Sequence, residues 1–235
     1  MSGNSARVIV GIIGVTGGIG RALSVACRDR GYVVVGFSRN PGTDEVPLNL
    51  SAPEPMVSRV IAETAERVGE FTAWVNLAGA DILSEPVRSM SYEAKLNQLW
   101  EIDVLGSVRC SRAILPHLVA DGCVINIGWD DACIGHQGTF GELYALTKAA
   151  VTAYSKSLAM TLNASSKKVF VFAPGWVSTR WHAGLTTQQR DTYTEYITDG
   201  AWQTPEEVGE AIADLIVGRA ALDSGTVYVL PKRES

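Results

Sequence analysis

The feature that most constrains the fold is a short buried-strand pattern that runs directly into a glycine-rich turn and a helix. Residues 8–13 are apolar and largely β-branched, which predicts a buried strand. They are followed by Gly14-Val-Thr-Gly-Gly18-Ile-Gly20, and Arg21 continues into an amphipathic helical pattern. Glycines let a backbone turn tightly against a pyrophosphate, and a helix N-terminus offers N–H groups to its charge. The order strand, glycine turn, helix therefore predicts a dinucleotide-binding unit, with a plain βα turn as the alternative.

Strand and helix patterns alternate along the rest of the chain. Further strands are expected at 32–37, 46–51, 71–77, 124–127, 169–173 and 226–230. Helices are expected at about 51–68, 92–118, 142–163 and 205–218, the last with Thr204 as N-cap and Glu207 completing a capping box. Such alternation predicts an α/β protein, with a doubly wound parallel seven-stranded sheet of the Rossmann type and helices on both faces. We expect residues 1–235 to form a single domain.

The carboxyl end of the second strand pattern indicates which dinucleotide would bind. Ser38 and Arg39 stand where a dinucleotide fold faces the adenosine ribose. An acidic residue there would bind the 2′-hydroxyl of NAD(H), and none is present. An arginine beside a hydroxyl suits a 2′-phosphate, so the sequence favours NADP(H) as the cofactor.

Composition excludes several other classes of function. The net charge is −5 and the pI about 5.3, with no run of lysines or arginines, which argues against nucleic acid or an anionic membrane as partner. No apolar stretch is long enough to span a bilayer. Four scattered cysteines without C-x-x-C spacing predict free thiols and a cytoplasmic location. Cys133 and His136 are too few to indicate a metal site, so we expect no metal.

Three stretches offer side chains for chemistry. Tyr144 and Lys148 are four residues apart and share one helix face, where the ammonium is expected to lower the pKa of the phenol. In the helix at 92–118, Asp103 lies on an inward stripe that also holds Leu96, Leu99, Trp100 and Ser107. An inward carboxylate needs a partner or a role in the chemistry. Residues 178–203 are rich in aromatic side chains and follow a strand, which predicts a substrate lid or else a helical excursion that packs its aromatics.

Four motifs in this order resemble the short-chain dehydrogenase/reductase family over residues 8–230. They are Gly14-x-x-x-Gly18-Ile-Gly20, Asn76-Leu-Ala-Gly79, Tyr144-x-x-x-Lys148 and Pro174-Gly175-Trp-Val-x-Thr179. The resemblance implies that Tyr144 donates the proton to a carbonyl oxygen, and that Lys148 tunes Tyr144 and holds the nicotinamide ribose. It also implies a homodimer or homotetramer and a small-molecule substrate.

The resemblance further implies a set of cofactor-binding residues. The pyrophosphate would be held by Gly14, Thr16, Gly18, Ile19 and Gly20, and the adenosine end by Ser38, Arg39, Asn49 and Leu50. The nicotinamide side would be lined by Asn76, Ala78, Gly79, Pro174, Gly175, Val177 and Thr179. We expect Trp129, Trp176 and Trp181 to contact the substrate.

The sequence departs from the family pattern at three places. Ile13 replaces a threonine before the first glycine, and Asp103 aligns with a helix asparagine. A serine that orients the substrate carbonyl falls on Trp129 by motif register, or on Asp131 by its spacing to the tyrosine. Asp103 and either Asp130 or Asp131 are therefore candidate catalytic acids beside Tyr144 and Lys148.

Three functions remain open from the sequence. The first is NADPH-dependent reduction of a ketone or aldehyde of a bulky or ring-containing molecule, with Tyr144 as general acid. The second is reduction of an imine, iminium or hemiaminal, because a carboxylate in place of the serine would stabilise a cationic centre. The third is a protein that binds the dinucleotide without catalysis.

Overall fold

The computed structural model describes residues 7–135, 138–179, 186–187 and 202–231. Its seven strands are β1 (Ile9–Ile13), β2 (Val33–Ser38), β3 (Val46–Pro47), β4 (Phe71–Asn76), β5 (Leu118–Ile127), β6 (Lys168–Ala173) and β7 (Val227–Val229). They form one sheet in the order β3-β2-β1-β4-β5-β6-β7, and every neighbouring pair is parallel. The predicted doubly wound Rossmann sheet is confirmed. β3 has only two residues, shorter than the predicted strand, and β5 begins six residues earlier than expected at Leu118.

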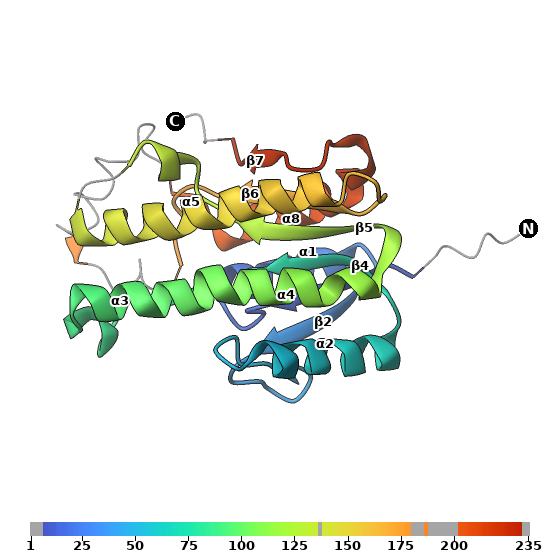
Figure 1. The fold of residues 1–235 in the computed structure, drawn as a ribbon, viewed down its shortest axis with the longest axis horizontal. Helices are drawn as coiled ribbons and strands as arrows, with labels where there is room; N and C mark the ends of the chain where they lie inside the picture. Colours follow the sequence, from blue (N-terminus) through green and yellow to red (C-terminus); the bar gives the residue numbers. More distant parts are fainter. Residues whose placement is uncertain (1–6, 136–137, 180–185, 188–201, 232–235) are drawn as a thin grey trace, which may run out of the picture.

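Helices cover both faces of this sheet. The main ones are α1 (Gly18–Asp29), α2 (Glu54–Val68), α3 (Tyr92–Leu99), α4 (Gly106–Ile114), α5 (Gly138–Thr161) and α8 (Pro205–Gly218). Short helical turns η1 (Val87–Ser89), η3 (Leu115–His117), η4 (Asp130–Cys133) and η5 (Arg219–Ala221) connect elements. In Figure 1, α4 and α5 cross the front of the sheet while α1 and α8 lie behind it. No helix among the described residues is long and apolar enough to cross a membrane.

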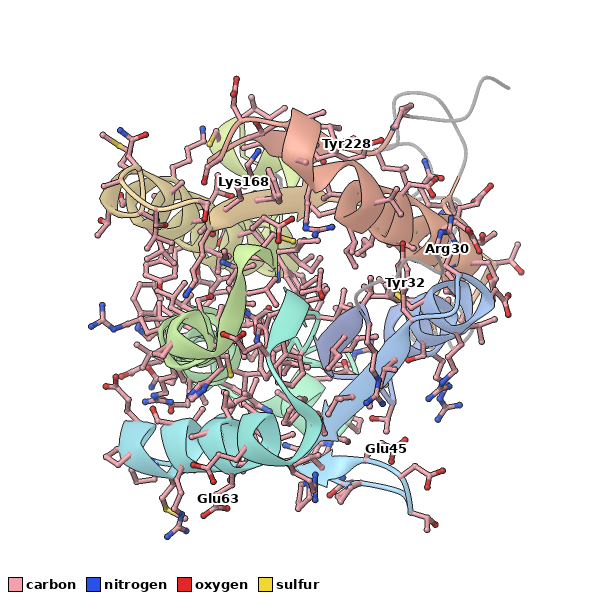
Figure 2. The ribbon with its side chains drawn as sticks, turned by 90° about the vertical axis from the view of Figure 1, so that its right-hand side faces the viewer. Arg30, Tyr32, Glu45, Glu63, Lys168 and Tyr228 are labelled. Atoms are coloured by element: carbon pink, nitrogen blue, oxygen red, sulfur yellow. The ribbon has the colours of Figure 1, made fainter. Side chains whose placement is uncertain are left out.

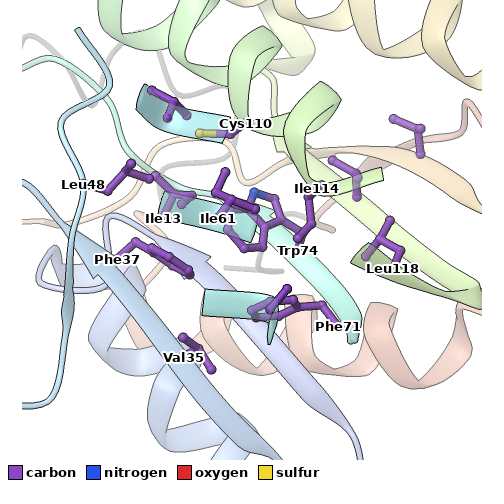
Figure 3. Packing of buried hydrophobic residues seen from close by; sticks show 14 of the residues in the cluster. Ile13, Val35, Phe37, Leu48, Ile61, Phe71, Trp74, Cys110, Ile114 and Leu118 are labelled. Carbon is purple, nitrogen blue, oxygen red and sulfur yellow. The ribbon is translucent and has the colours of Figure 1, made fainter. Parts of the chain in front are cut away.

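The two layers of helices enclose two apolar cores. One core lies between the sheet and the helices α2, α4 and α5, and its centre is Trp74 (Figure 3). The Trp74 ring is tilted against Phe37 and edge-on to Phe71, with ring centroids 4.9 and 5.3 Å away. The same ring occupies the space above Gly11, where a Cβ would collide with it. This contact explains the single glycine in the otherwise apolar first strand.

The second core lies between the sheet and the helices α1 and α8. Figure 2, turned by 90°, shows Arg30 beside these helices and Glu63 on α2 at the far side of the sheet. Arg30 is paired with Glu210 and Asp214 of α8 at 2.8 and 2.5 Å, which ties α1 to α8. The predicted capping box at the start of α8 is confirmed: Glu207 N donates to Thr204 Oγ1, and Thr204 N donates to Glu207 Oε2.

The helix predicted at 92–118 is interrupted by a π-helical turn, η2 (Trp100–Leu105), between α3 and α4. Asp103 lies in this turn and is 1% exposed, as the inward stripe predicts. Trp100 is 41% exposed, so its predicted inward position is wrong. The wider turn changes the helical phase at this point, and such turns often occur at functional sites.

Candidate active site

The glycine turn between β1 and α1 lies against the end of β4. Gly14 has φ +82°, and a Cβ on it would lie 2.8 Å from the Ala78 amide nitrogen. A Cβ on Gly20 would collide with the Gly14 carbonyl oxygen. α1 begins after Gly17 without a side-chain cap and without an acidic residue in its first turn. The glycines therefore leave the backbone of the turn uncovered, and an anion can reach the N-terminus of α1. This fits the predicted binding of a dinucleotide pyrophosphate at Gly14, Gly18, Ile19 and Gly20.

The residues predicted at the adenosine end lie beside this turn, with one correction. The hydroxyls of Thr16 and Ser38 are 3.1 Å apart, so they join the glycine turn to the end of β2. Arg39 follows as an exposed side chain and forms no ion pair with any described residue. Asn49 is exposed as well, and its Oδ1 accepts a hydrogen bond from Ser51 N. The Leu50 side chain is instead buried in the core, so it can offer only its backbone to an adenine.

A second correction concerns Asn76 at the end of β4. Its side chain is buried and enters a polar network below the site, where its Nδ2 donates to Asn126 Oδ1 at 2.7 Å and to Ser111 Oγ at 3.1 Å. Trp74 Nε1 donates to its Oδ1 at 3.0 Å, and Asn126 in turn donates to Ser155 Oγ. Asn76 therefore joins β4 to β5, α4 and α5 and does not line the cofactor site with its side chain. Ala78 and Gly79 remain at the rim through their backbone.

The opposite rim is formed by residues 174–179 after β6. Pro174 is buried, and Gly175 has φ +71° and redirects the chain. Val177 pairs with Gln203 in an isolated parallel bridge, and Ser178 N donates to the Gln203 carbonyl at 2.8 Å. A Cβ on Gly18 would lie 3.8 Å from Thr179 Cγ2, so this rim contacts the glycine turn. The two predicted cofactor-binding motifs thus lie next to one another.

The bridge also closes the base of the predicted lid at 178–203. Residues 180–185 and 188–201, which include Trp181, lie outside the described residues. What the structure describes is that Ser178 and Gln203, the two ends of this segment, are held together. The lid and the placement of Trp181 stay predictions.

Tyr144 and Lys148 lie together on α5 and converge on Ala80. The Tyr144 hydroxyl donates to the Ala80 carbonyl at 3.1 Å. Lys148 Nζ is paired with Asp103 Oδ2 at 2.9 Å, and Asp103 Oδ1 accepts the Ala80 N–H at 2.8 Å. One peptide segment after β4 is therefore bound by the tyrosine on one side and by the aspartate on the other. Sequence reasoning missed Ala80 because it contributes only backbone groups.

The electrostatics of Tyr144 differ from the expectation. Burial raises its pKa above the ordinary value for tyrosine, and the negative charges of Asp103 and Asp81 raise it further. The sequence predicts that Lys148 lowers this pKa, but the ammonium is paired with Asp103. The pKa of Tyr144 is therefore raised, not lowered as the sequence predicts, and its hydroxyl is protonated at neutral pH. Asp81 is a second contributor that the sequence did not single out.

An aromatic cluster occupies the region where the family pattern has its serine. Trp129 is half-buried after β5 and lies edge-on to Trp176, with ring centroids 6.1 Å apart. Trp176 is edge-on to Trp202 at 5.5 Å. Asp130 begins the turn η4 and is half-buried, whereas the side chain of Asp131 lies outside the described part of the chain. The segment 128–135 contains no serine, so a hydroxyl that orients the substrate carbonyl is absent from it.

Comparisons with known proteins agree with this geometry. A family model described as enoyl-(acyl carrier protein) reductase matches residues 14–230. Carbonyl reductase family member 4 of Xenopus tropicalis is 26% identical over 88% of this chain and 90% of its own length. The 3-oxoacyl-[acyl-carrier-protein] reductase FabG of Vibrio cholerae is 26% identical over 93% of each chain.

Solved structures show the same fold. A 3-ketoacyl-(acyl-carrier-protein) reductase from Brucella melitensis, complexed with NADH, has a TM-score of 0.78 at 19% identity and covers 95% of this chain and 96% of its own. A variant of ElxO with NADPH bound has a TM-score of 0.80 at 20% identity, over 95% and 96% of the two chains. The motifs, the sheet order and these matches identify the chain as a member of the short-chain dehydrogenase/reductase family of oxidoreductases.

Proposed function

We propose that this protein is an NADP(H)-dependent reductase of a ketone or aldehyde, with Tyr144 as the general acid. The observation that carries the proposal is the placement of Tyr144. Its hydroxyl donates to the carbonyl of Ala80, which follows β4, and it lies on the same helix as the lysine that would hold the nicotinamide ribose. Its raised pKa keeps it protonated at neutral pH, which is the state needed to donate a proton to a carbonyl oxygen. The names of the two relatives describe reductases of carbonyl compounds.

Each part of the proposed site has a role in this reaction. The bound dinucleotide supplies the hydride that reaches the carbonyl carbon. The glycine turn and the N-terminus of α1 hold the pyrophosphate, and residues 174–179 orient the nicotinamide end. Tyr144 O–H transfers its proton to the carbonyl oxygen, and solvent reprotonates it. The cluster of Trp129, Trp176 and Trp202 provides an apolar wall that suits a ring-containing substrate and excludes water.

The preference for NADP(H) is supported by Arg39 at the end of β2. The side chain is exposed, forms no ion pair within the described residues, and has no acidic neighbour at position 38 or 40. A guanidinium is well suited to a 2′-phosphate because it forms paired charged hydrogen bonds. One solved structure with this fold holds NADH and another holds NADPH, so the fold does not indicate which cofactor binds. The proposed preference for NADP(H) therefore depends on Arg39. We also propose a cytoplasmic homodimer or homotetramer whose single domain spans residues 1–235.

One of the two acidic residues on which the imine alternative depends does not fit that function. It requires Asp103 and an acid near the serine position to face one substrate. Asp103 is buried and paired with Lys148, so it cannot offer its charge to a substrate cation. Asp130 or Asp131 would have to act alone.

The test is a panel of cyclic ketones, aromatic aldehydes and cyclic imines with NADPH, followed by loss of the NADPH absorbance. The proposal expects turnover of at least one ketone or aldehyde, faster with NADPH than with NADH. Turnover of imines alone would support the alternative and contradict the carbonyl proposal. Tight NADPH binding without turnover across the panel would support the non-catalytic function.

A further inference from the structure

We propose that Asp103 is a positioning residue that holds and neutralises Lys148, so that Tyr144 stays protonated and can act as a proton donor throughout the neutral pH range. The inference rests on the proposed function, in which Tyr144 exchanges the proton with the substrate. It adds a residue that sets the pH range in which Tyr144 gives or takes that proton.

The two oxygens of Asp103 have separate partners. Oδ1 accepts the Ala80 N–H at 2.8 Å, and Oδ2 lies 2.9 Å from Lys148 Nζ. The side chain of Asp103 is 1% exposed and that of Lys148 is 14% exposed, so little water screens the pair. A Cβ on Gly79 would lie 3.3 Å from Oδ2, so the glycine leaves room for the carboxylate at this place. The ion pair is therefore built into the packing of η2, α5 and the segment after β4.

The contact of Asp103 with Ala80 does not require a charge. An asparagine at position 103 could accept the Ala80 N–H through its amide oxygen in the same way. Its NH₂ group would then face the lysine ammonium, donor against donor. The carboxylate is needed where it faces Lys148, and it offsets the positive charge that would otherwise act on Tyr144.

The other charged groups around α5 do not restore that positive charge. Among the described residues on neighbouring elements, Glu101 is paired with Arg109 at 2.5 Å, and Lys95 lies 5.5 Å from the centre of the Phe140 ring. Glu142 on α5 itself accepts a hydrogen bond from Tyr92 at 3.3 Å. Burial, Asp103 and Asp81 all raise the pKa of Tyr144.

The protonation state of Tyr144 decides which proton transfer it can carry out. Reduction needs the protonated phenol, which gives its proton to the carbonyl oxygen while the hydride adds to carbon. Oxidation needs the phenolate, which takes the proton from the alcohol while hydride leaves to the oxidised cofactor. A phenol whose pKa is raised is protonated over the whole neutral range, so reduction is independent of pH there and oxidation rises with pH.

The experiment is a tyrosinate absorbance titration of the purified full chain, which needs no substrate. Subtracting the titration of Tyr144→Phe from that of the unmodified chain isolates Tyr144, and subtracting Asp103→Asn/Tyr144→Phe from Asp103→Asn does the same in the variant. We expect Tyr144 to ionise above the ordinary tyrosine pKa of about 10. In Asp103→Asn its midpoint should fall by at least about one pH unit, because a negative charge is lost and a positive one is released. Asp81→Asn is the matched control, since it removes the same charge without touching the ion pair and should change the midpoint less.

Two results would overturn the inference. One is ionisation of Tyr144 below pH about 10 in the unmodified chain, which decides the matter even if Asp103→Asn does not fold. The other is a fall of the midpoint in Asp103→Asn no larger than that in Asp81→Asn. If the titrations come out as expected but no carbonyl compound is reduced, the protonation inference is supported and the proposed function is contradicted. With a reducible substrate in hand, the pH at which the oxidation rate rises should fall in Asp103→Asn by about as many pH units as the Tyr144 midpoint falls.

Discussion

Gly14 and Ala78 are in direct contact across the point where β1 and β4 end side by side. A Cβ on Gly14 would lie 2.8 Å from the Ala78 amide nitrogen and 2.9 Å from its Cα. The strand order changes direction here, because β2 and β3 lie on one side of β1 while β4 lies on the other. Open α/β sheets bind their ligands at such a point. The contact therefore holds the glycine turn against the segment that follows β4.

Gly14→Ala should destabilise the protein more than Gly31→Ala does. Both glycines have positive φ, +82° and +75°, so both variants carry the cost of about 1–2 kcal/mol for a side chain in that region. Nothing lies within 4 Å of a Cβ on Gly31, whereas one on Gly14 meets the Ala78 backbone. Urea unfolding should show an additional loss for Gly14→Ala of at least about 1 kcal/mol. Equal losses would show that the contact with Ala78 carries no cost.

Arg39→Ala should remove the preference for NADPH over NADH. Loss of a charged hydrogen bond to phosphate corresponds to about 1.5–3 kcal/mol, or about tenfold or more in the NADPH dissociation constant. NADH binding should hardly change. Arg59→Ala is the control, because Arg59 is an exposed arginine on α2 that forms a long ion pair with Glu63 at 3.9 Å. Equal affinity for the two cofactors in the unmodified chain would contradict the assignment of Arg39.

The cysteines should differ sharply in reactivity with a disulfide reagent. All four are free thiols, as the sequence predicts; Cys133 is exposed, while Cys27, Cys110 and Cys123 are buried. Burial raises the pKa of each of these three to about 12, so at pH 8 they hold the proton and react slowly. One thiol should react rapidly in the native chain, and Cys133→Ser should abolish that phase. Two or more rapid thiols before unfolding would contradict this account.

Much of the fold can be predicted because its signals are local. The glycine turn, the alternating patterns and the capping box of Thr204 and Glu207 each act within a few residues of sequence, and all three are confirmed. The strand β3 is shorter than predicted because it is the edge strand and pairs only through Val46 and Pro47.

The sequence predictions fail where contacts between residues far apart in the chain determine the structure. The spacing of the stripe assumes a continuous α-helix, so it places Asp103 correctly but cannot foresee the π turn that leaves Trp100 exposed. The charge of Lys148 is evident from the sequence, but its pairing with Asp103 joins two helices and is not. Asn76 belongs to a motif near the cofactor, yet its amide is used between strands. Ala80 has no polar side chain, so nothing in the sequence marks it.

Tyr144→Phe tests the central claim most directly, because it removes one hydroxyl from α5 and leaves the ring. Tyr154→Phe is the matched control on the same helix, where the hydroxyl lies 3.4 Å from the Val108 carbonyl, away from Ala80. With any carbonyl compound that the unmodified chain reduces, Tyr144→Phe should lower kcat by about 10²–10⁴-fold while NADPH binding stays within about twofold, and Tyr154→Phe should keep its activity. Retention of kcat in Tyr144→Phe would contradict the account, since another group would then supply the proton.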